Sequence, residues 1–284
     1  MPEGDTVFVA AARLRDALGG DAIVRSDLRV PSLATVDLAG RNVEDVVSRG
    51  KHLLFRFSGE LTLHTHYKMD GTWHLYRPGE RWRGPDFEVR AVLYTDGWVA
   101  VGFRLAVVEL LARADEHDAI GHLGSDPLGD DWDPDVVESA LRARGTEAIG
   151  TVLLDQRVIA GPGNVYKSEV CFLSGTHPWT PVAEVADLRR MVDLVARLMR
   201  ANRTTGNQMT TGDRRPGRQR WVYGRAGKRC FRCGETIRRG EQDGYGGERV
   251  TFWCPGCQPQ IGRADASMSS EEPIEKAGAN AQNR

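Results

Sequence analysis

The sequence lacks any uninterrupted apolar run of about 18 residues, so it does not predict a helix that spans a membrane. Cysteine is scarce, with five residues in 284, and four of the five lie between positions 230 and 257. An odd, clustered set of this kind does not indicate a disulfide framework and favours a metal site in a reducing cytoplasm. The opening residues 1–5 are acidic and include no basic segment, so a secretory signal is not expected.

The chain is nevertheless long enough and apolar enough to bury a substantial core. Hydrophobic residues make up 40% of the 284 positions, which allows two packed units. Charged residues make up 27%, and seven tryptophans are present, which argues against disorder throughout the chain.

Positive charge is missing from one part of the chain and concentrated in another. The net charge is −1, but residues 201–263 hold 13 Lys and Arg against 5 Asp and Glu, a net of +8. Residues 115–138 hold nine acids and neither Lys nor Arg. A basic module on an acidic body indicates contact with a polyanion at one face, although a solvated Arg-rich surface explains the same pattern.

Hydrophobic periodicity predicts an antiparallel β-sandwich behind a leading helix, an α+β arrangement. Apolar positions at helical spacing precede Gly19, and short β-rich runs separated by turn residues follow. These runs are residues 22–30, 43–47, 52–57, 61–67, 89–94 and 98–103.

The second half of the chain predicts helices and then a small hairpin. The helix candidates are residues 135–144, 150–154, 165–173 and 182–202. We expect domains at residues 1–125, 126–220 and 221–261, with a disordered tail at 262–284, which lacks aromatic residues.

Two cysteine pairs predict a metal-binding hairpin. Cys230 and Cys233 are separated by two residues, as are Cys254 and Cys257, and 20 residues lie between the pairs. Four thiolates at this spacing are typical of one structural Zn²⁺ ion, which supplies folding energy that about 40 residues lack. A redox dithiol fits two paired knuckles poorly. Cys171, in an apolar run, is expected in the core.

Basic residues surround this predicted hairpin. On a rigid support they can neutralise phosphates or enter a groove of a nucleic acid, and the alternative is a solvated basic face. The set comprises Arg225, Lys228, Arg229, Arg232, Arg238, Arg239 and Arg249.

A glycine-rich turn precedes the helix candidate at residues 165–173. Gly161 and Gly163 allow close approach of the backbone to a phosphate, and the following helix N-terminus offers N–H donors. Asn164 can cap the helix or donate to a phosphate oxygen. An ordinary turn between two packed helices explains the pattern equally well.

The N-terminus offers a candidate nucleophile. Removal of Met1 would leave Pro2 with a secondary amine at the start of a helix, where its pKa lies below that of lysine. The adjacent Glu3 could move protons, and Lys51 follows Gly50 in a predicted turn. Each feature also has a structural explanation, so none of them alone establishes catalysis.

In combination these motifs resemble the formamidopyrimidine-DNA glycosylase/endonuclease VIII family. The resemblance extends from Pro2 to about Ile261. Its elements are Pro2-Glu3-Gly4, Gly50-Lys51, Gly161-x-Gly163-Asn164-x-Tyr166-x-x-Glu169, Tyr223-Gly224-Arg225, and Arg249-x-Thr251-Phe252-Trp253-Cys254-Pro255-x-Cys257-Gln258.

The resemblance implies a β-sandwich, a helix–two-turn–helix domain and a zinc finger, with damaged DNA bound between the halves. It implies a bifunctional enzyme that excises oxidised bases and cuts the strand by β,δ-elimination. Pro2 would form a Schiff base with the sugar C1′, and Glu3 would act as general acid and base. Lys51 would hold a phosphate, as would the set Asn164, Arg249 and Arg157. Met69 matches the position of the family's wedge, which fills the void left by the flipped base.

The chain departs from the purine-repair branch of the family at two places and from the family's opening motif at a third. Residues 101–106 replace that branch's Asp-x-Arg-Arg-Phe-Gly, and residues 204–221 look shorter than its lesion-capping loop. Both departures favour the endonuclease VIII branch and oxidised pyrimidines. Asp5 replaces the usual proline of the opening motif, without an explanation from the sequence.

Three alternatives stay open: a catalytically silent damage-binding paralogue, a purine-directed glycosylase and a zinc-ribbon factor of transcription or translation. Intact Pro2, Glu3 and Lys51 argue against the first alternative. We expect a cytoplasmic, nucleoid-associated monomer without a membrane partner. Its expected partner is damaged double-stranded DNA, with bubble or single-stranded DNA as the alternative.

Overall fold

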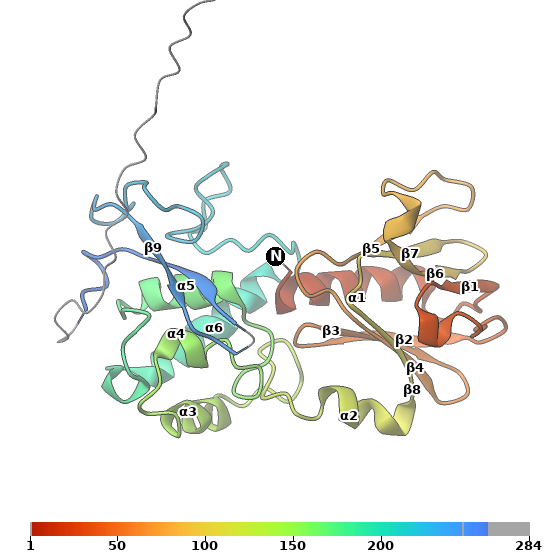
Figure 1. Ribbon diagram of the computed structural model, residues 1–284, viewed down its shortest axis with the longest axis horizontal. Helices are drawn as coiled ribbons and strands as arrows, with labels where there is room; N and C mark the ends of the chain where they lie inside the picture. The colour runs from red at the N-terminus through yellow and green to blue at the C-terminus, as the bar shows by residue number, and fades with distance from the viewer. Residues whose placement is uncertain (1, 246, 261–284) are drawn as a thin grey trace, which may run out of the picture.

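A computed structural model describes residues 2–245 and 247–260 of the chain. Residue 1 and the expected tail at 262–284 lie outside the described residues. The molecule is elongated, with a β-rich half and a helical half side by side, and the chain start lies between them (Figure 1). The predicted order of a sandwich followed by helices and a cysteine hairpin is confirmed.

The β-rich half consists of the first helix and two four-stranded sheets. One sheet has the strand order β2-β3-β4-β8 and the other β1-β6-β7-β5, and all pairings are antiparallel. The bounds are α1 Gly4–Leu18, β1 Arg25–Leu28, β2 Val43–Arg49, β3 His52–Phe57, β4 Leu61–His66, β5 Thr72–Tyr76, β6 Val89–Tyr94, β7 Val99–Phe103 and β8 Val107–Ala112.

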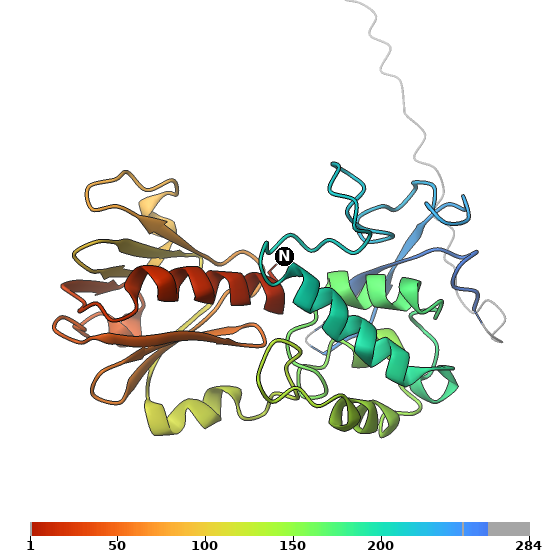
Figure 2. The ribbon, with the colours of Figure 1, turned by 180° about the vertical axis from the view of Figure 1, so that it is seen from behind.

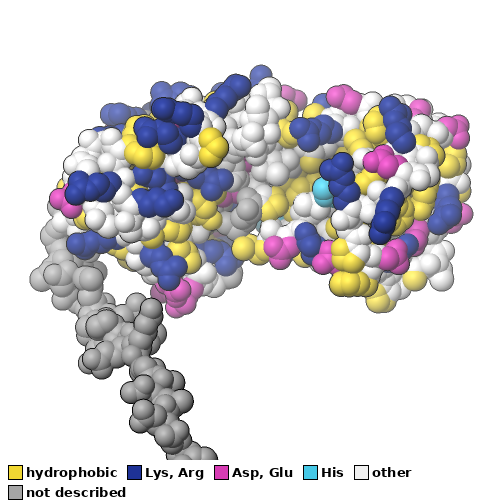
Figure 3. Space-filling model, turned by 90° about the horizontal axis from the view of Figure 1, so that it is seen from above, with side chains coloured by type: hydrophobic (Ala, Val, Ile, Leu, Met, Phe, Trp, Pro, Cys, Tyr) yellow, Lys and Arg dark blue, Asp and Glu magenta, His cyan; other side chains and the backbone are white. Residues whose placement is uncertain are grey.

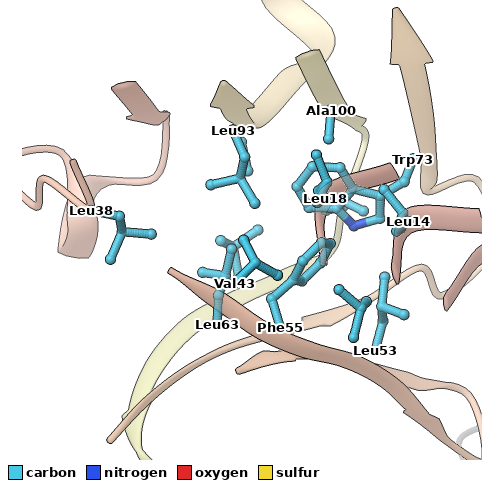
Figure 4. Packing of buried hydrophobic residues seen from close by; sticks show 14 of the residues in the cluster. Leu14, Leu18, Leu38, Val43, Leu53, Phe55, Leu63, Trp73, Leu93 and Ala100 are labelled. Carbon is cyan, nitrogen blue, oxygen red and sulfur yellow. The ribbon is translucent and has the colours of Figure 1, made fainter. Parts of the chain in front are cut away.

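The core of this half lies between the two sheets and α1. Leu14 and Leu18 of the helix meet side chains of both sheets, including Phe55 of β3 and Leu93 of β6 (Figure 4). These residues are almost completely buried, as their spacing of three and four positions along α1 predicts. The sandwich therefore forms a firm support for the N-terminal end of α1.

Two strands of the sandwich are absent from the sequence prediction. β5 follows the turn at residues 68–70, and β8 has apolar residues on both sides of Glu109 without strict alternation. Both are edge strands of their sheets, where pairing with a neighbour defines the strand more than its own pattern does.

The helical half packs its helices around a second apolar core (Figure 2). The bounds are α3 Pro134–Arg142, α4 Ile149–Val152, α5 Asn164–Leu173 and α6 Leu188–Asn202. The short helix α2, Glu116–Ile120, lies beside the sandwich, where Glu116 accepts from Arg56 of β3 and Thr62 of β4. The prediction that the last helix begins at residue 182 is wrong. Residues 182–184 form a separate 3₁₀ turn after Pro181, and α6 begins after Asp187, whose carboxylate caps the helix by accepting from the N–H of Arg190.

A two-stranded hairpin follows, with β9 at Arg238–Gln242 and β10 at Arg249–Trp253. It packs against α5. No helix among the described residues has the length and apolar character needed to cross a membrane.

Candidate functional site

The three motifs at positions 2–4, 50–51 and 161–164 meet at the seam between the two halves. The N–H of Gly4 donates to the carbonyl of Gly161 over 2.9 Å. A Cβ atom on Gly4 would lie 2.8 Å from the Cα of Gly161 and 3.2 Å from the carbonyl oxygen of Gly50, so only glycine fits here. The start of α1 is thereby fixed against both other motifs.

Glu3 lies completely buried at the N-terminal end of α5. Its carboxylate accepts from the N–H of Gly163 at 2.6 Å, Val165 at 2.8 Å and Tyr166 at 3.4 Å. A Cβ on Gly163 would lie 2.6 Å from the carboxyl carbon, so the glycine permits this approach. Burial raises the pKa of Glu3, while the Lys51 ammonium and the Val165 N–H lower it in part.

This arrangement differs from the expectation that the same helix end receives a phosphate. The backbone donors at residues 163–166 already bind Glu3, a carboxylate supplied by the chain itself. Negative charge at a helix N-terminus stabilises the helix, whether a phosphate or a carboxylate of the protein provides it. The glycine-rich turn therefore positions the carboxylate of Glu3 and does not leave these N–H groups free for an external anion.

Lys51 lies in the tight turn between β2 and β3, as predicted. Its Nζ donates to the carbonyl of Pro162 over 2.7 Å. Burial lowers the pKa of Lys51 to about 8; the nearby Glu3 opposes this shift, and Arg249 adds to it. The ammonium therefore keeps most of its charge at neutral pH and loses its proton as the pH rises through about 8.

The turn that carries Lys51 is held from the other half of the molecule. The N–H of Gly50 donates to the buried carboxylate of Asp126 over 2.6 Å, and Asp126 also accepts from the N–H of Leu128 at 2.9 Å. Arg49 donates to the carbonyl of Gly124 over 3.0 Å. The sequence analysis missed Asp126, and the only available signal was its place in a Gly- and Asp-rich turn.

The four predicted DNA contacts are not equally exposed. Arg249, at the start of β10, lies near enough to Lys51 and Lys167 to lower the pKa of both. Within the described chain its guanidinium makes one weak hydrogen bond, to the carbonyl of Glu248. Asn164 is buried and donates to the carbonyl of Val250, so it ties α5 to the hairpin.

The side chain of Arg157 is half exposed, but its guanidinium is paired with a carboxylate of the protein. It forms a bidentate pair with Asp155, at 2.9 Å from Nε to Oδ1 and 2.9 Å from Nη2 to Oδ2. Met69 is 57% exposed in the turn between β4 and β5, directly after Lys68, whose φ is +52°. Its exposure and place beside the seam suit contact with another molecule.

The four cysteines converge at the end of the hairpin. Their sulfur atoms lie within 4.8 Å of one another, and they form the one group of metal-ligating side chains found among the described residues. The Cys230 and Cys257 sulfurs are 3.9 Å apart, and those of Cys233 and Cys254 are 3.3 Å apart. A tetrahedral site with metal–sulfur bonds of about 2.3 Å requires sulfur separations of about 3.8 Å. The cluster is therefore arranged to bind a metal ion.

Glu169 anchors the hairpin to α5. Its buried carboxylate accepts from the N–H of Trp221 at 2.7 Å, Val222 at 2.8 Å and Tyr223 at 2.8 Å, and from the hydroxyl of Thr210. Glu169 belongs to the motif that begins at Gly161, but the motif alone does not indicate this role. A glutamate within a buried helix segment is the signal that could have identified it.

The upper surface of the molecule carries the basic charge expected from the sequence. Seen from above, Lys and Arg gather densely over the half that carries the hairpin, and the surface is hollowed between the halves (Figure 3). The catalytic candidates of the seam thus lie between a basic lobe and the sandwich.

Comparison with known proteins agrees with this architecture. The family model described as the formamidopyrimidine-DNA glycosylase N-terminal domain matches residues 1–106, and that of the family's H2TH domain matches residues 123–211. Over 261 residues the chain is 52% identical to "Probable endonuclease 8 2" of Streptomyces coelicolor, covering 91% of this chain and 94% of that protein.

Another relative and a solved structure show the same likeness. The chain is 48% identical to "DNA-(apurinic or apyrimidinic site) lyase Nei2" of Mycolicibacterium smegmatis, over 91% of this chain and 99% of the relative. The fold matches that of Lactococcus lactis Fpg, solved in complex with abasic-site DNA, with a TM-score of 0.76 at 21% identity, over 91% of this chain and 100% of that one. The chain therefore belongs to the formamidopyrimidine-DNA glycosylase/endonuclease VIII family, as its motifs predict.

Proposed function

We propose that this protein is a bifunctional DNA glycosylase and abasic-site lyase of base-excision repair. The observation that carries the proposal is the seam, where three motifs that are distant in sequence meet. Glu3 and Gly4 bind the turn before α5, and Lys51 donates to the carbonyl of Pro162 in the same turn. The names of two relatives, an endonuclease 8 at 52% identity and an abasic-site lyase at 48% identity, support the proposal.

In this mechanism Pro2, freed of Met1, attacks the sugar C1′ of a flipped nucleotide as the base leaves, which divides one difficult step into two easier ones. Ring opening then breaks the C1′–O4′ bond of the resulting aminal: O4′ takes up a proton, and the nitrogen lone pair forms an iminium ion, which acidifies the C2′ proton. β-Elimination then expels the 3′ phosphate, and δ-elimination expels the 5′ phosphate. Glu3, whose pKa is raised by burial, is suited to carry protons during base loss and ring opening.

Lys51 and Arg249 supply positive charge beside this reaction centre. Their mutual proximity lowers the pKa of Lys51, so an incoming phosphate would relieve a repulsion that exists in the free protein. We propose that both bind the phosphates that flank the damaged nucleotide. Met69, at the exposed turn before β5, is our candidate for the wedge that fills the duplex.

Asn164 and Arg157 already bind other groups of the protein, and their proposed roles on DNA take these contacts into account. Asn164 would act on DNA by placing the β10 backbone, because its amide already binds the carbonyl of Val250. Arg157 would share its guanidinium between Asp155 and a phosphate. We assign the cysteine site to one structural Zn²⁺, which holds the hairpin and its arginines in place.

We favour oxidised pyrimidines in damaged double-stranded DNA as substrates. In the segment that departs from the purine-repair branch, Phe103 is buried, and Arg104 donates to Glu88 over 2.8 Å and to the carbonyl of Asp70 over 3.2 Å. The strand end therefore presents no free arginine pair for reading the opposite base. We also propose that the chain is divided into domains at residues 1–125, 126–220 and 221–261. The two family segments, matched at residues 1–106 and 123–211, support the first two domains.

The test is borohydride trapping on a duplex with one abasic site, using protein whose mass confirms loss of Met1. We expect a covalent protein–DNA adduct that is absent when a short N-terminal extension blocks the Pro2 amine. The matched control is the same extended protein, which should keep its affinity for the duplex. Absence of an adduct with the free terminus, while DNA binding is intact, would support the silent damage-binding paralogue instead.

A further inference from the structure

Asp5 is a buried carboxylate that the proposed mechanism does not use. It is 0% exposed, although it lies only three positions after Pro2. Its Oδ2 accepts from the hydroxyl of Tyr166 over 2.8 Å, and its carboxylate is also hydrogen-bonded to the side chain of Gln208. A buried charge is retained only where its partners compensate it, so these contacts require a structural or functional reason.

The contacts continue from Tyr166 to Asn202, at the last residue of α6. Asn202 Nδ2 donates to the Tyr166 hydroxyl at 3.0 Å and to the carbonyl of Met209 at 3.0 Å, while its Oδ1 accepts from the N–H of Met209 at 3.1 Å. Asn202 thus binds both backbone groups of Met209, as a neighbouring strand would. Tyr166 and Asn202 are 0% and 1% exposed.

The segment held in this way separates two cavities. Residues 204–209 form one wall of a cavity of about 600 Å³, whose other lining includes Tyr223 and Arg220. On its other side, Thr205 and Gly206 close a cavity of about 410 Å³ against Thr6 and residues 9–10 of α1. The position of this segment therefore decides the shape of both cavities, and the smaller one borders the first turn of α1 at Thr6.

The reactive end itself is held by other contacts. Glu3 binds the α5 N-terminus, and the N–H of Gly4 donates to the carbonyl of Gly161. None of these bonds uses the side chains of Asp5, Tyr166 or Asn202. Loss of those side-chain contacts is thus expected to release residues 204–209 while the amine and Glu3 stay in place.

We propose that Asp5, Tyr166 and Asn202 form a positioning relay that fixes residues 204–209 as the wall of the pocket for the flipped damaged base. The inference rests on the proposed glycosylase activity and assigns specificity within it. It explains why an aspartate, rather than proline, occupies position 5. An abasic site carries no base, so its cleavage does not require this wall.

The experiment compares two single-turnover rates: excision of thymine glycol, an oxidised pyrimidine, from a duplex, and cleavage of a preformed abasic site in the same sequence. For Asn202→Asp, which loses the donors to Tyr166 and Met209, we expect base excision to fall about tenfold, the effect of one or two buried hydrogen bonds. Abasic-site cleavage should stay within about twofold of the unchanged protein. Tyr76→Phe is the matched control, because this buried hydroxyl of the sandwich accepts one hydrogen bond, from the N–H of Arg83, far along the chain from the relay.

A double variant tests whether the residues act as one unit. Asp5→Asn combined with Asn202→Asp should lose no more excision than the larger single effect, since members of a relay are not additive. Should Asn202→Asp fail to fold, Asp5→Asn is assayed alone by the same two rates. Equal loss of both rates, unchanged excision, or additive losses would overturn the relay. Absence of abasic-site cleavage in the unchanged protein would instead overturn the proposed function.

Discussion

The sandwich and the cysteine hairpin are stabilised in different ways. The sandwich encloses a cluster of 21 buried apolar residues, whereas the hairpin's cluster has five, of which two are cysteines of the metal site. Apolar burial can stabilise the first alone, but not the second. We propose that the hairpin relies on a metal held by its four cysteines, together with the hydrogen bonds of Glu169. On this proposal, a rigid sandwich is combined with a DNA-binding element whose folding depends on a metal.

Removing the metal should show the largest difference between the two regions, because it should affect the hairpin and not the sandwich. Structural zinc sites contribute about 10–16 kcal/mol to folding in isolated fingers. We expect Cys254→Ser to abolish stoichiometric zinc, measured by atomic absorption, and to weaken duplex binding at least about tenfold through loss of the Arg249 position. The melting transition of the sandwich should persist in this variant. A variant that loses zinc but binds duplex DNA normally would contradict the dependence on metal.

A cavity created in the core of the sandwich should destabilise the sandwich and leave the cysteine hairpin unchanged. Phe55 is 0% exposed between the sheets, so Phe55→Ala should lower the free energy of unfolding by about 3–5 kcal/mol. Denaturant unfolding measures this loss. Zinc content should be unchanged, and loss of zinc at low denaturant would show that the two regions are not independent.

Glu169 tests the non-metal part of the hairpin's support. In Glu169→Gln the amide keeps one acceptor oxygen for the N–H groups of residues 221–223 but loses the charge. We expect the free energy of unfolding to fall by about 2 kcal/mol. Hydrogen exchange should show the loss in residues 221–260, and Glu184→Gln, on an exposed 3₁₀ turn, is the control. Uniform loss across the chain would contradict a local role.

The seam offers a smaller, pH-dependent effect. Since the pKa of Lys51 lies at about 8, its positive charge is present below that pH and is lost as the pH rises through it. Affinity for a duplex with a stable abasic-site analogue should therefore fall up to about tenfold between pH 7 and 9. Lys51→Arg should remove this pH dependence, because arginine keeps its charge. Fluorescence anisotropy at constant ionic strength measures both proteins, and identical pH profiles would contradict the assignment.

Local patterns predicted much of the fold. The spacing of apolar residues in α1 and the short β-rich runs of β2 and β3 are local signals, and the cysteine spacing alone indicates a metal site. The start of α6 was misplaced because Val182 and Val185 continue its apolar spacing, although Asp187 begins the helix.

The detail of the site depends on contacts between distant residues. Glu3 and Gly163 are 160 positions apart, so no local pattern reveals that the glutamate fills the α5 N-terminus. Asp126 and Gly50 are similarly separated, by 76 positions. The sequence could therefore name Pro2, Glu3 and Lys51 as candidates, but not the contacts that hold them together.

The central claim is that the N-terminal amine, rather than a lysine, forms the covalent bond to DNA. The direct test is to trap the adduct with borohydride, digest protein and DNA, and identify the modified residue by mass spectrometry. The account predicts the sugar remnant on the nitrogen of Pro2, in the peptide that begins at that residue. A remnant on Lys51 or Lys167, the two lysines whose pKa lies at about 8, would contradict it.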